Sequence, residues 1–405
     1  MSEGGYSGSA ARGVRQNFEI DRTSRPVGRR LTLARNPLLM ASPLSPAAFF
    51  GLCAFSGFAL LLFFDSRLAP LPLIAFVVAC TIAPSLPRVG FFLPVISRGK
   101  PGERGVALTF DDGPDPELTP QLLDLLERHD VSATFFVTGE KATRHPEIIR
   151  EIISRGHSIG NHSFSHMPHL MLKGMRTLRR EVKAAQSVLG LFNIVPLAFR
   201  PPVGITNPHL WPVLIEQKMF CVTFSCRGMD MGNRWISRLS SRVLRKVAPG
   251  DIVALHDVAP PRASAERVLG EFESLISGLK EKGLEIVPLA RLIGTEVMQR
   301  LEDKSPGGYN DKSLGRGRSR SMTVKEQLKK IIIEGINLEE VRPEDIVDSA
   351  PLFGEGLGLD SLDAVELVVL IQKHFGIEIK DMEEGREAFR SIDSLAAFVE
   401  ERRRG

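Results

Sequence analysis

From Gly105 onward, short apolar stretches alternate with amphipathic stretches, and this alternation restricts the possible folds more than any other feature of the chain. The apolar stretches predict seven strands, over residues 106–110, 133–137, 157–160, 197–200, 221–225, 251–255 and 284–288. Helical patterns lie between them, for example over residues 120–129, 146–155 and 177–189. A strand followed by a helix, repeated about seven times, predicts an α/β fold with a parallel (β/α) barrel. Such barrels carry their chemistry at the carboxyl ends of the strands.

Side chains that suit a metal site follow three of these strands. Asp112 follows the first strand, and His162 and His166 follow the third. One carboxylate oxygen and two imidazole nitrogens suit Zn²⁺, or Co²⁺ or Ni²⁺, and leave positions open for water. Adjacent carboxylates at a strand end point to opposite sides, so Asp111 is predicted to stay free as a base. His256 ends the sixth strand and adds a third imidazole to the same edge.

Other readings of these residues are simpler. Paired Asp residues before Gly-Pro are also ordinary turn chemistry, and a pair of His residues is often solvated surface. The chain has only nine His, however, and three of them lie beside strand ends that also carry Asp. This coincidence favours the metal site.

Residues 100–296 resemble the polysaccharide deacetylases, the family-four carbohydrate esterases that include chitin, peptidoglycan and nodulation-factor deacetylases. The five motifs that carry the resemblance are residues 109–114, 162–166, 200–204, Asp230 and residues 255–257. The resemblance implies a distorted, incomplete barrel that removes the N-acetyl group of an amino sugar by hydrolysis. Val203 stands where that family usually has an aromatic residue, and Met231 stands where a Trp is common. We therefore expect a different sugar-stacking surface.

The residues also suggest how an amide is hydrolysed here. A bound divalent ion polarises the carbonyl and lowers the pKa of bound water from 15.7 toward about 7, and Asp111 takes the proton of that water. Prolines have no N–H, so after Pro201 and Pro202 the first backbone donor for the oxyanion is that of Val203. His256, as an imidazolium, is predicted to protonate the departing amine.

The sequence offers more than one partner for His256. Asp230 is predicted either to hold the tautomer of His256 or to anchor Arg200 against Asp111. Asp251 and Asp257 lie close to His256 in the chain and compete for the first role. Each of these carboxylates is also an ordinary loop cap.

A second pattern lies near the C-terminus. Residues 353–363 are rich in Gly and end in Asp360-Ser361-Leu362-Asp363, which opens a helix that runs toward Phe375. Ser after Asp at a helix start is often only a cap. The whole segment over residues 323–403, with four helical stretches, nevertheless resembles an acyl carrier protein. The resemblance implies a 4'-phosphopantetheine arm on Ser361, attached by a phosphopantetheinyl transferase. An acidic face read by acyl-loading or acyl-transfer enzymes would comprise Asp360, Asp363 and Glu366.

Two apolar runs near the N-terminus, over residues 47–64 and 68–86, predict a membrane hairpin within residues 47–87, because each is close to the roughly 20 residues that cross a bilayer. The basic arm over residues 1–46 contains seven Arg, and Arg88, Arg98, Lys100 and Arg104 follow the hairpin. This excess predicts an inner-membrane protein with both flanks in the cytoplasm. A long signal peptide or a re-entrant pair is the alternative, and residues 77–80 resemble a lipoprotein cleavage site. The long basic arm argues against such processing.

Residues 302–322 are rich in Gly, Ser, Lys and Arg and predict a flexible linker between the two domains. No aromatic residue except Tyr309 interleaves its basic cluster, and the net charge of the chain is only +4, so a nucleic-acid partner is not expected. The four Cys have no spacing typical of disulfides or a zinc knuckle, which allows a reducing compartment.

The sequence therefore predicts a membrane-anchored, cytoplasm-facing, metal-dependent N-deacetylase fused to an acyl carrier domain. Carrier proteins receive their arm in the cytosol, which favours a sugar carried on a lipid or a nucleotide over a finished wall polymer. Two other classes stay open. In one, the carrier domain serves lipid or natural-product synthesis and the barrel deacylates a carrier-linked or non-sugar amide. In the other, the barrel is an inactive glycan-binding module.

Overall fold

The computed structural model of the chain describes residues 45–260, 264–301 and 322–404, apart from residues 337, 339, 340, 355, 378, 380 and 381. The predicted basic arm lies outside these residues except for positions 45 and 46. The predicted linker lies outside them except for position 322.

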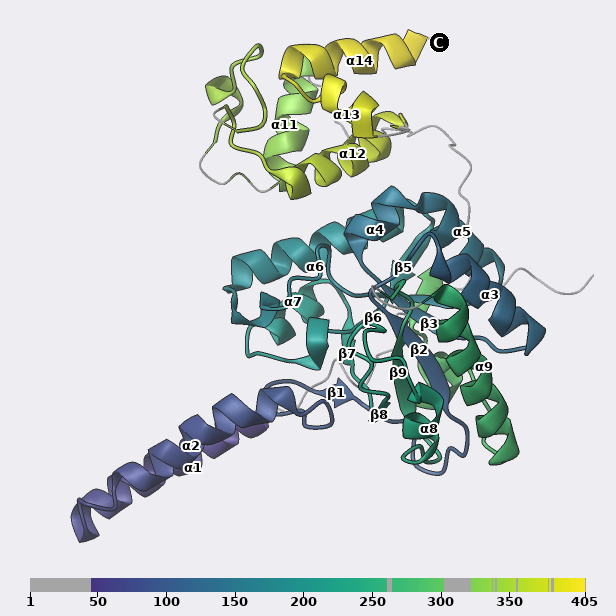
Figure 1. Cartoon of the computed structure of the whole chain (residues 1–405). Helices are drawn as coiled ribbons and strands as arrows, with labels where there is room; N and C mark the ends of the chain where they lie inside the picture. The colour runs from purple at the N-terminus through teal and green to yellow at the C-terminus, as the bar shows by residue number, and fades with distance from the viewer. Residues whose placement is uncertain are drawn as a thin grey trace, which may run out of the picture. The chain divides into compact units, whose positions relative to one another are not determined.

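A curled, eight-stranded sheet forms the centre of the barrel (Figure 1). In spatial order its strands are β1 (Val95–Ile96), β7 (Phe220–Val222), β6 (Ala198–Phe199), β4 (Ser158–Asn161), β3 (Thr134–Val137), β2 (Ala107–Asp111), β9 (Ile252–His256) and β8 (Cys226–Arg227). All neighbouring pairs are parallel. Among the described residues β1 and β8 do not pair with each other, so the barrel is open. The predicted α/β fold with an incomplete barrel is confirmed.

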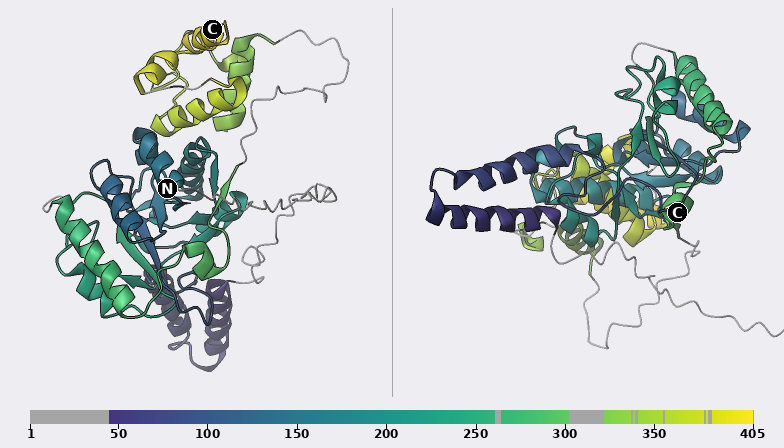
Figure 2. Two further views of the ribbon diagram at one scale, coloured as in Figure 1. Left: turned by 90° about the vertical axis from the view of Figure 1, so that its right-hand side faces the viewer. Right: turned by 90° about the horizontal axis from the view of Figure 1, so that it is seen from below.

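Helices cover the outside of this sheet (Figures 1 and 2). They are α3 (Leu118–Arg128), α4 (Gly139–Arg144), α5 (Pro146–Ser154), α6 (Met175–Gly190), α7 (Leu210–Glu216), α8 (Leu239–Leu244), α9 (Ala265–Glu281) and α10 (Leu289–Ile293), with short 3₁₀ turns η3 (Leu170–Leu172) and η4 (Pro202–Gly204). α3 shows why they pack there. Its leucines recur at helical spacing and are buried in the core, among them Leu118, Leu122 and Leu125. The strands are apolar on both faces because helices cover one side and the barrel interior the other.

The strand predictions hold for the central strands to within about a residue and fail at the edges. The predicted strand over residues 284–288 forms only an isolated bridge between Val106 and Ile286, and Pro288 ends it because proline cannot donate a ladder hydrogen bond. The predicted strand over residues 221–225 is instead β7 followed, after a break, by β8. β1 and an antiparallel pair, β5 (Ile194–Pro196) with β10 (Met298–Arg300), were not predicted, because two or three residues give too short a pattern.

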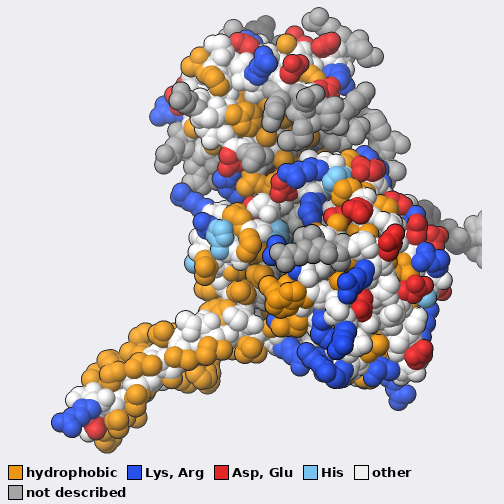
Figure 3. Space-filling view, viewed as in Figure 1, with side chains coloured by type: hydrophobic (Ala, Val, Ile, Leu, Met, Phe, Trp, Pro, Cys, Tyr) orange, Lys and Arg blue, Asp and Glu red, His pale blue; other side chains and the backbone are white. Residues whose placement is uncertain are grey.

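The N-terminal apolar runs fold as two packed helices, α1 (Pro46–Phe64) and α2 (Pro70–Ile82), the second extended by the 3₁₀ turn η2 (Ala83–Ser85). Glycines of α1 allow the close approach, since a Cβ at Gly51 would lie 3.1 Å from the Phe76 ring. Within the described residues, α1 alone is long and apolar enough to cross a membrane, whereas the apolar helix over Pro70–Ser85 is shorter. Hydrophobic side chains cover the hairpin surface (Figure 3), and Phe63 and Phe64 are 89% and 80% exposed. One such helix fits an anchor or a signal sequence, and the two-span topology stays a prediction.

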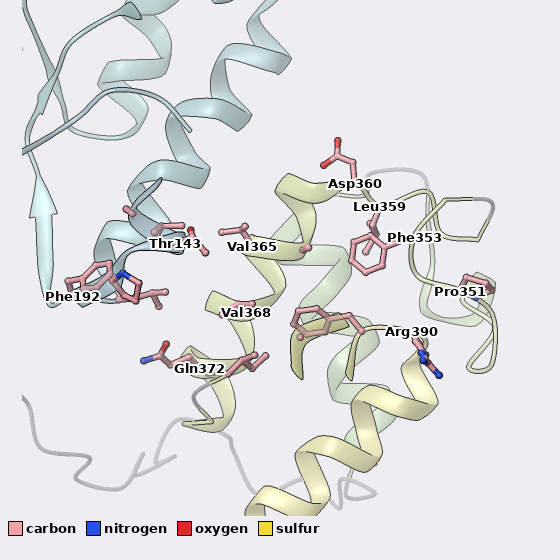
Figure 4. A pocket seen from close by; sticks show the side chains of 18 of the residues that line it. Thr143, Phe192, Pro351, Phe353, Leu359, Asp360, Val365, Val368, Gln372 and Arg390 are labelled. Atoms are coloured by element: carbon pink, nitrogen blue, oxygen red, sulfur yellow. The ribbon is translucent and has the colours of Figure 1, made fainter. Parts of the chain in front are cut away.

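The C-terminal segment forms a separate helical domain with its own core. Its helices are α11 (Val324–Ile336), α12 (Ser361–Phe375), α13 (Met382–Ala388) and α14 (Ile392–Arg404), with a 3₁₀ turn η5 (Pro343–Asp345). The core is contributed by all four helices and the loop before α12, including Leu328, Leu359, Leu367, Phe389 and Leu395. Asp360 caps α12 by accepting from the backbone N–H groups of Leu362 and Asp363. Figure 4 shows Asp360 at the start of α12 and Val365 and Val368 along the helix.

Candidate active site

Three predicted metal ligands meet at the carboxyl ends of β2 and β4. His162 Nε2 lies 3.2 Å and His166 Nε2 lies 3.0 Å from Asp112 Oδ1. One ligand atom from each residue lies within 4.8 Å of the others. Asp112 directly follows β2, whereas His162 and His166 stand at the two ends of the loop that follows β4. The two strands that supply the set lie on either side of β3 in the sheet.

The hydrogen bonds of His162 show that this set suits a cation. His162 Nδ1 lies 2.7 Å from the carbonyl oxygen of Arg200, which accepts, so Nδ1 carries the proton. Nε2 then presents a lone pair toward Asp112 Oδ1. That oxygen is buried and receives no hydrogen bond from any described residue. Two lone pairs that face each other repel unless a cation lies between them, so these residues fit a divalent metal ion.

The state of Asp112 agrees with this role. Burial raises the pKa of Asp112, but the hydrogen bonds and positive charge that His162 and His166 offer in their protonated, metal-free form lower it more, so that its pKa lies well below its usual range. The carboxylate is thus ionised, as a metal ligand must be. The backbone is left-handed at Asp112 (φ 71°) and at His166 (φ 50°). Asp and His are among the few non-glycine residue types that adopt this conformation readily.

Asp111 lies on the opposite side of the same strand end and contacts a buried arginine. Arg200 Nη1 donates to Asp111 Oδ1 at 2.6 Å and to the hydroxyl of Thr109 at 2.7 Å. Its Nη2 donates to the carbonyl of Thr223 at 3.0 Å, and the guanidinium lies 4.0 Å from the centre of the Phe136 ring. Arg200 is fully buried, and Asp111 is 5% exposed. Arg200 therefore fixes the position of the Asp111 carboxylate.

His256 faces the same site from β9. Its Nδ1 donates to Asp230 Oδ2 at 2.8 Å, and its Nε2 lies 3.9 Å from Asp112 Oδ2. Burial lowers the pKa of His256, but the hydrogen bond with Asp230 and the charges of Asp230, Asp112 and Asp111 outweigh it and raise the pKa to about 9. His256 is thus an imidazolium at neutral pH, which suits a proton donor.

The comparisons with known proteins agree with this geometry. The family model for polysaccharide deacetylase matches residues 98–220, and the model for the phosphopantetheine attachment site matches residues 326–399. A chitooligosaccharide deacetylase from Bradyrhizobium sp. (strain ANU 289) is 34% identical over 201 residues, which are 47% of this chain and 91% of that protein. The chain belongs to the polysaccharide deacetylase family. It is a hydrolase of N-acetyl amide bonds with a C-terminal phosphopantetheine-binding domain, as predicted.

Two further relatives of this polysaccharide deacetylase are similar over the same region. A peptidoglycan-N-acetylglucosamine deacetylase from Bacillus cereus is 35% identical over 193 residues, which are 47% of this chain and 68% of that protein. A crystal structure of a peptidoglycan N-acetylglucosamine deacetylase has 30% identity and a TM-score of 0.47, and the match covers 50% of this chain and 94% of the other.

The deacetylase structure shows which of the three candidate carboxylates, Asp230, Asp251 and Asp257, contacts His256. Asp230 alone of the three bonds to the imidazole. Asp251 accepts from the Ser225 hydroxyl at 2.7 Å and lies 3.1 Å from Arg98. Asp257 accepts from the Thr119 hydroxyl at 2.9 Å, and burial raises its pKa to about 8. Its carboxylate fills the space beside Gly113, where a Cβ would lie only 2.1 Å from Asp257 Oδ2. Asp257 therefore requires glycine in the turn after Asp112.

The predicted oxyanion donor and the loop that carries Asp230 form an exposed rim of the deacetylase site. Val203 is 52% exposed and adopts φ 55°, which is unusual for a β-branched residue. Met229, Met231 and Trp235 are 47%, 57% and 61% exposed. The sequence analysis did not predict that Trp235 lies on this rim, because the motif spacing does not indicate that a residue five positions after Asp230 is exposed. It also missed Thr109, which opens the first motif and bonds to Arg200.

Proposed function

We propose that the deacetylase domain hydrolyses the N-acetyl group of an amino sugar with the help of a divalent cation held by Asp112, His162 and His166. The convergence of Asp112 Oδ1 and the two Nε2 atoms supports this proposal most strongly, because His162 Nε2 and His166 Nε2 lie 3.2 Å and 3.0 Å from one carboxylate oxygen, as ligands around a single cation would. When bound there, the ion supplies Lewis-acid polarisation of the amide carbonyl and makes water more acidic.

The side chains around this position divide the proton transfers between them. Asp111, held by Arg200, accepts the proton of the attacking water. The backbone N–H of Val203 donates to the oxyanion that develops on the carbonyl oxygen. His256, kept protonated by Asp230, gives its Nε2 proton to the departing amine nitrogen. Acid and base thus stand side by side on the paired strands β9 and β2, where His256 and Asp111 are register partners, and this weighs against an inactive glycan-binding barrel.

A metal-dependence experiment tests this function. The full chain is purified in detergent, stripped with a chelator and reloaded with Zn²⁺, Co²⁺ or Ni²⁺, and acetate release from chitooligosaccharides is measured. We expect activity only in the reloaded protein. Asp111→Asn should keep the metal and lose turnover by about 10²–10⁴-fold. An Asp111→Asn variant with nearly full activity and bound metal would show that the base is wrong.

We infer that the natural substrate is an N-acetylated sugar carried on a lipid or a nucleotide. The apolar α1 and α2 helices and the carrier domain support this, since both suit chemistry at a membrane rather than on a wall polymer. Mass spectrometry of lipid-linked sugars in a strain that lacks the protein is the test. An accumulating N-acetylated glycolipid is the expected result. Accumulation of a carrier-linked or non-sugar amide would favour the carrier-centred alternative instead.

We also propose that the chain is anchored in the inner membrane by a two-span hairpin, with both domains in the cytoplasm. The exposed apolar surface of α1 and α2 and the flanking basic residues support the proposal. In a variant without the native Cys, single Cys residues at positions 30 and 312 should be protected from impermeant thiol reagents in intact cells. One at position 66 should react if the hairpin spans. Labelling at position 312 but not at position 30 would indicate an odd number of crossings.

The carrier domain suggests a partner reaction. We propose that Ser361 carries the phosphopantetheine arm and that the domain delivers an acyl thioester to the amine that deacetylation frees. A flexible linker raises the effective concentration of such a group, to the millimolar range for short linkers. The transfer requires a separate acyltransferase that reads the acidic α12. Unchanged N-acylation of the candidate glycolipid in Ser361→Ala cells, with the arm confirmed in the wild type, would refute the coupling.

A further inference from the structure

A buried glutamate on α6 accepts three hydrogen bonds from the loop that carries the two His ligands. Glu181 is fully buried. Its Oε2 accepts from the backbone N–H of Phe164 at 3.0 Å and from that of Ser165 at 2.9 Å. Its Oε1 accepts from the Ser165 hydroxyl at 2.8 Å. All three donors lie between His162 and His166.

These bonds explain why a charged residue stands in the core at this point. Removing a carboxylate from water costs several kcal/mol unless hydrogen bonds compensate for the lost hydration. Glu181 gains three donors from one loop and therefore depends on the conformation of that loop. In return, the loop depends on Glu181, because its backbone is left-handed at Ser163 (φ 67°) and at His166 (φ 50°). Such conformations persist only where the surroundings enforce them.

The same helix holds the start of the loop through a second set of bonds. Asn161, the last residue of β4, donates from Nδ2 to the carbonyl of Val182 at 3.1 Å. Its Oδ1 accepts from the backbone N–H of Ser163 at 2.9 Å. Adjacent residues of α6, Glu181 and Val182, thus hold the loop on both sides of its left-handed Ser163.

We propose that Glu181 is a positioning residue for the metal site: through Phe164 and Ser165 it places His166 Nε2 at ligand distance from Asp112. His162 is fixed independently by its bond to the Arg200 carbonyl. Among the described residues, the His166 imidazole has no hydrogen-bond partner of this kind, only Asp112 and a ring contact with His162 at 5.0 Å between centroids, so His166 relies on its backbone. The inference rests on the proposed metal site and adds a residue that touches neither metal nor substrate.

The chain contains a matched control. Glu271 on α9 accepts from two backbone N–H groups and one Ser hydroxyl, those of Arg238 (2.8 Å), Ser240 (2.9 Å) and the Ser240 side chain (2.6 Å). Glu271 has the same kinds of donor as Glu181, although it is only half-buried, and it holds the start of α8, which carries no metal ligand. A general loss of stability should therefore follow either substitution, and a loss of metal affinity only that of Glu181.

The experiment compares Glu181→Gln, Glu271→Gln and the wild-type full chain in detergent. Gln keeps the size of the side chain but cannot accept from three donors without pointing an N–H₂ group at one of them. Zn²⁺ affinity is measured by competition with a chromophoric chelator, the visible spectrum of the Co²⁺ form reports ligand geometry, and Tm is measured without metal. We expect Glu181→Gln to weaken Zn²⁺ binding about 10–100-fold and to alter the Co²⁺ spectrum. Glu271→Gln should leave both unchanged.

Ser165→Ala keeps the experiment decisive if Glu181→Gln does not fold. It removes one donor and leaves the carboxylate and both backbone bonds, so a smaller loss of Zn²⁺ affinity, with only a small fall in Tm, is expected. Equal Zn²⁺ affinity in Glu181→Gln and wild type, or in Ser165→Ala and wild type where Glu181→Gln is unfolded, would overturn the inference. So would an equal loss in Glu271→Gln. A wild-type protein that binds no Zn²⁺ or Co²⁺ would instead refute the metal site itself.

Discussion

The deacetylase site and the phosphopantetheine attachment site differ in how far apart their residues lie along the chain. The first draws side chains from β2, the loop after β4, the segment after β6 and β9, from Asp111 to His256. The second lies within one helix turn, where the Asp360 and Asp363 carboxylates each accept from the other's backbone N–H. Local hydrogen bonds therefore organise the carrier site, whereas only the packed sheet organises the deacetylase site.

The two sites also differ in which groups stabilise their charged side chains. The buried charges of the deacetylase site depend on distant partners, such as Arg200 on Asp111 and His256 on Asp230. Removing one partner leaves the other buried and unpaired, which costs about 3–5 kcal/mol. At the start of α12 the same kind of change removes only a cap, which is worth roughly 1 kcal/mol. Substitutions should therefore affect the two sites very differently.

The largest expected effect is that of Asp112→Ala. We expect the variant to lose bound metal and acetate release together, because one of three protein ligands is missing. Modification of Ser361 by a phosphopantetheinyl transferase should proceed as in the wild type, since the carrier domain has its own core. Metal analysis, acetate release and intact mass measure the three properties. Metal retention in Asp112→Ala would contradict the proposed ligand set. Loss of Ser361 modification would show that the two sites are not independent.

The next effect concerns His256 and Asp230. The pKa of His256 is raised from 6.5 to about 9, so its protonation contributes stability that is fully present below about pH 6.5 and is lost as pH rises through about 9. Asp230→Asn should lower that pKa and remove about 1.5–3 kcal/mol of stability at neutral pH, less than full loss of the partner, because Asn still accepts a hydrogen bond and His256 can become neutral. NMR titration of the metal-free protein and urea unfolding measure these changes. A His256 pKa that does not move in Asp230→Asn would assign the raised value to another partner.

A smaller effect compares two residues with left-handed backbone. Val203→Gly should stabilise the deacetylase domain by about 1 kcal/mol, because glycine adopts a positive φ without a steric cost. Acetate release should stay within a few-fold, since the backbone N–H is retained. Gly376, at φ 71° after α12, is the mirror case, and Gly376→Ala should destabilise the carrier domain by about 1 kcal/mol. Urea unfolding of both variants is the measurement. A destabilised Val203→Gly would show that the Val203 side chain has a packing role.

The smallest expected effect is that of Ser361→Ala on deacetylation. The deacetylase site contains no group that needs a thioester, so acetate release from chitooligosaccharides should be unchanged while the mass of the arm disappears. Asp360 caps α12, so this substitution should leave the start of the helix intact. A deacetylation rate that falls in Ser361→Ala would show that the arm takes part in the hydrolysis.

The sequence predicted the central strands well because their apolar runs are long enough to be read directly. It also predicted the start of α12, because the residues that mark it, Asp360, Ser361 and Asp363, are neighbours in the chain. It failed where pairing decides the structure: β1 has two residues, and the segment over residues 284–288 is apolar but forms a single bridge. A strand is stabilised by pairing with neighbouring strands, and a short sequence pattern does not predict which strands those are.

The sequence by itself determined the fold class, the two domains and the residue types at the strand ends, because these follow from periodicity and from motifs that are contiguous in the chain. Only the tertiary structure chose Asp230 over Asp251 and Asp257 as the partner of His256, placed Arg200 against Asp111 and put Glu181 beneath the His162–His166 loop. The physical reason is that a buried charge takes the nearest complementary group in space, and the packing of strands and helices sets that distance, not the spacing along the chain.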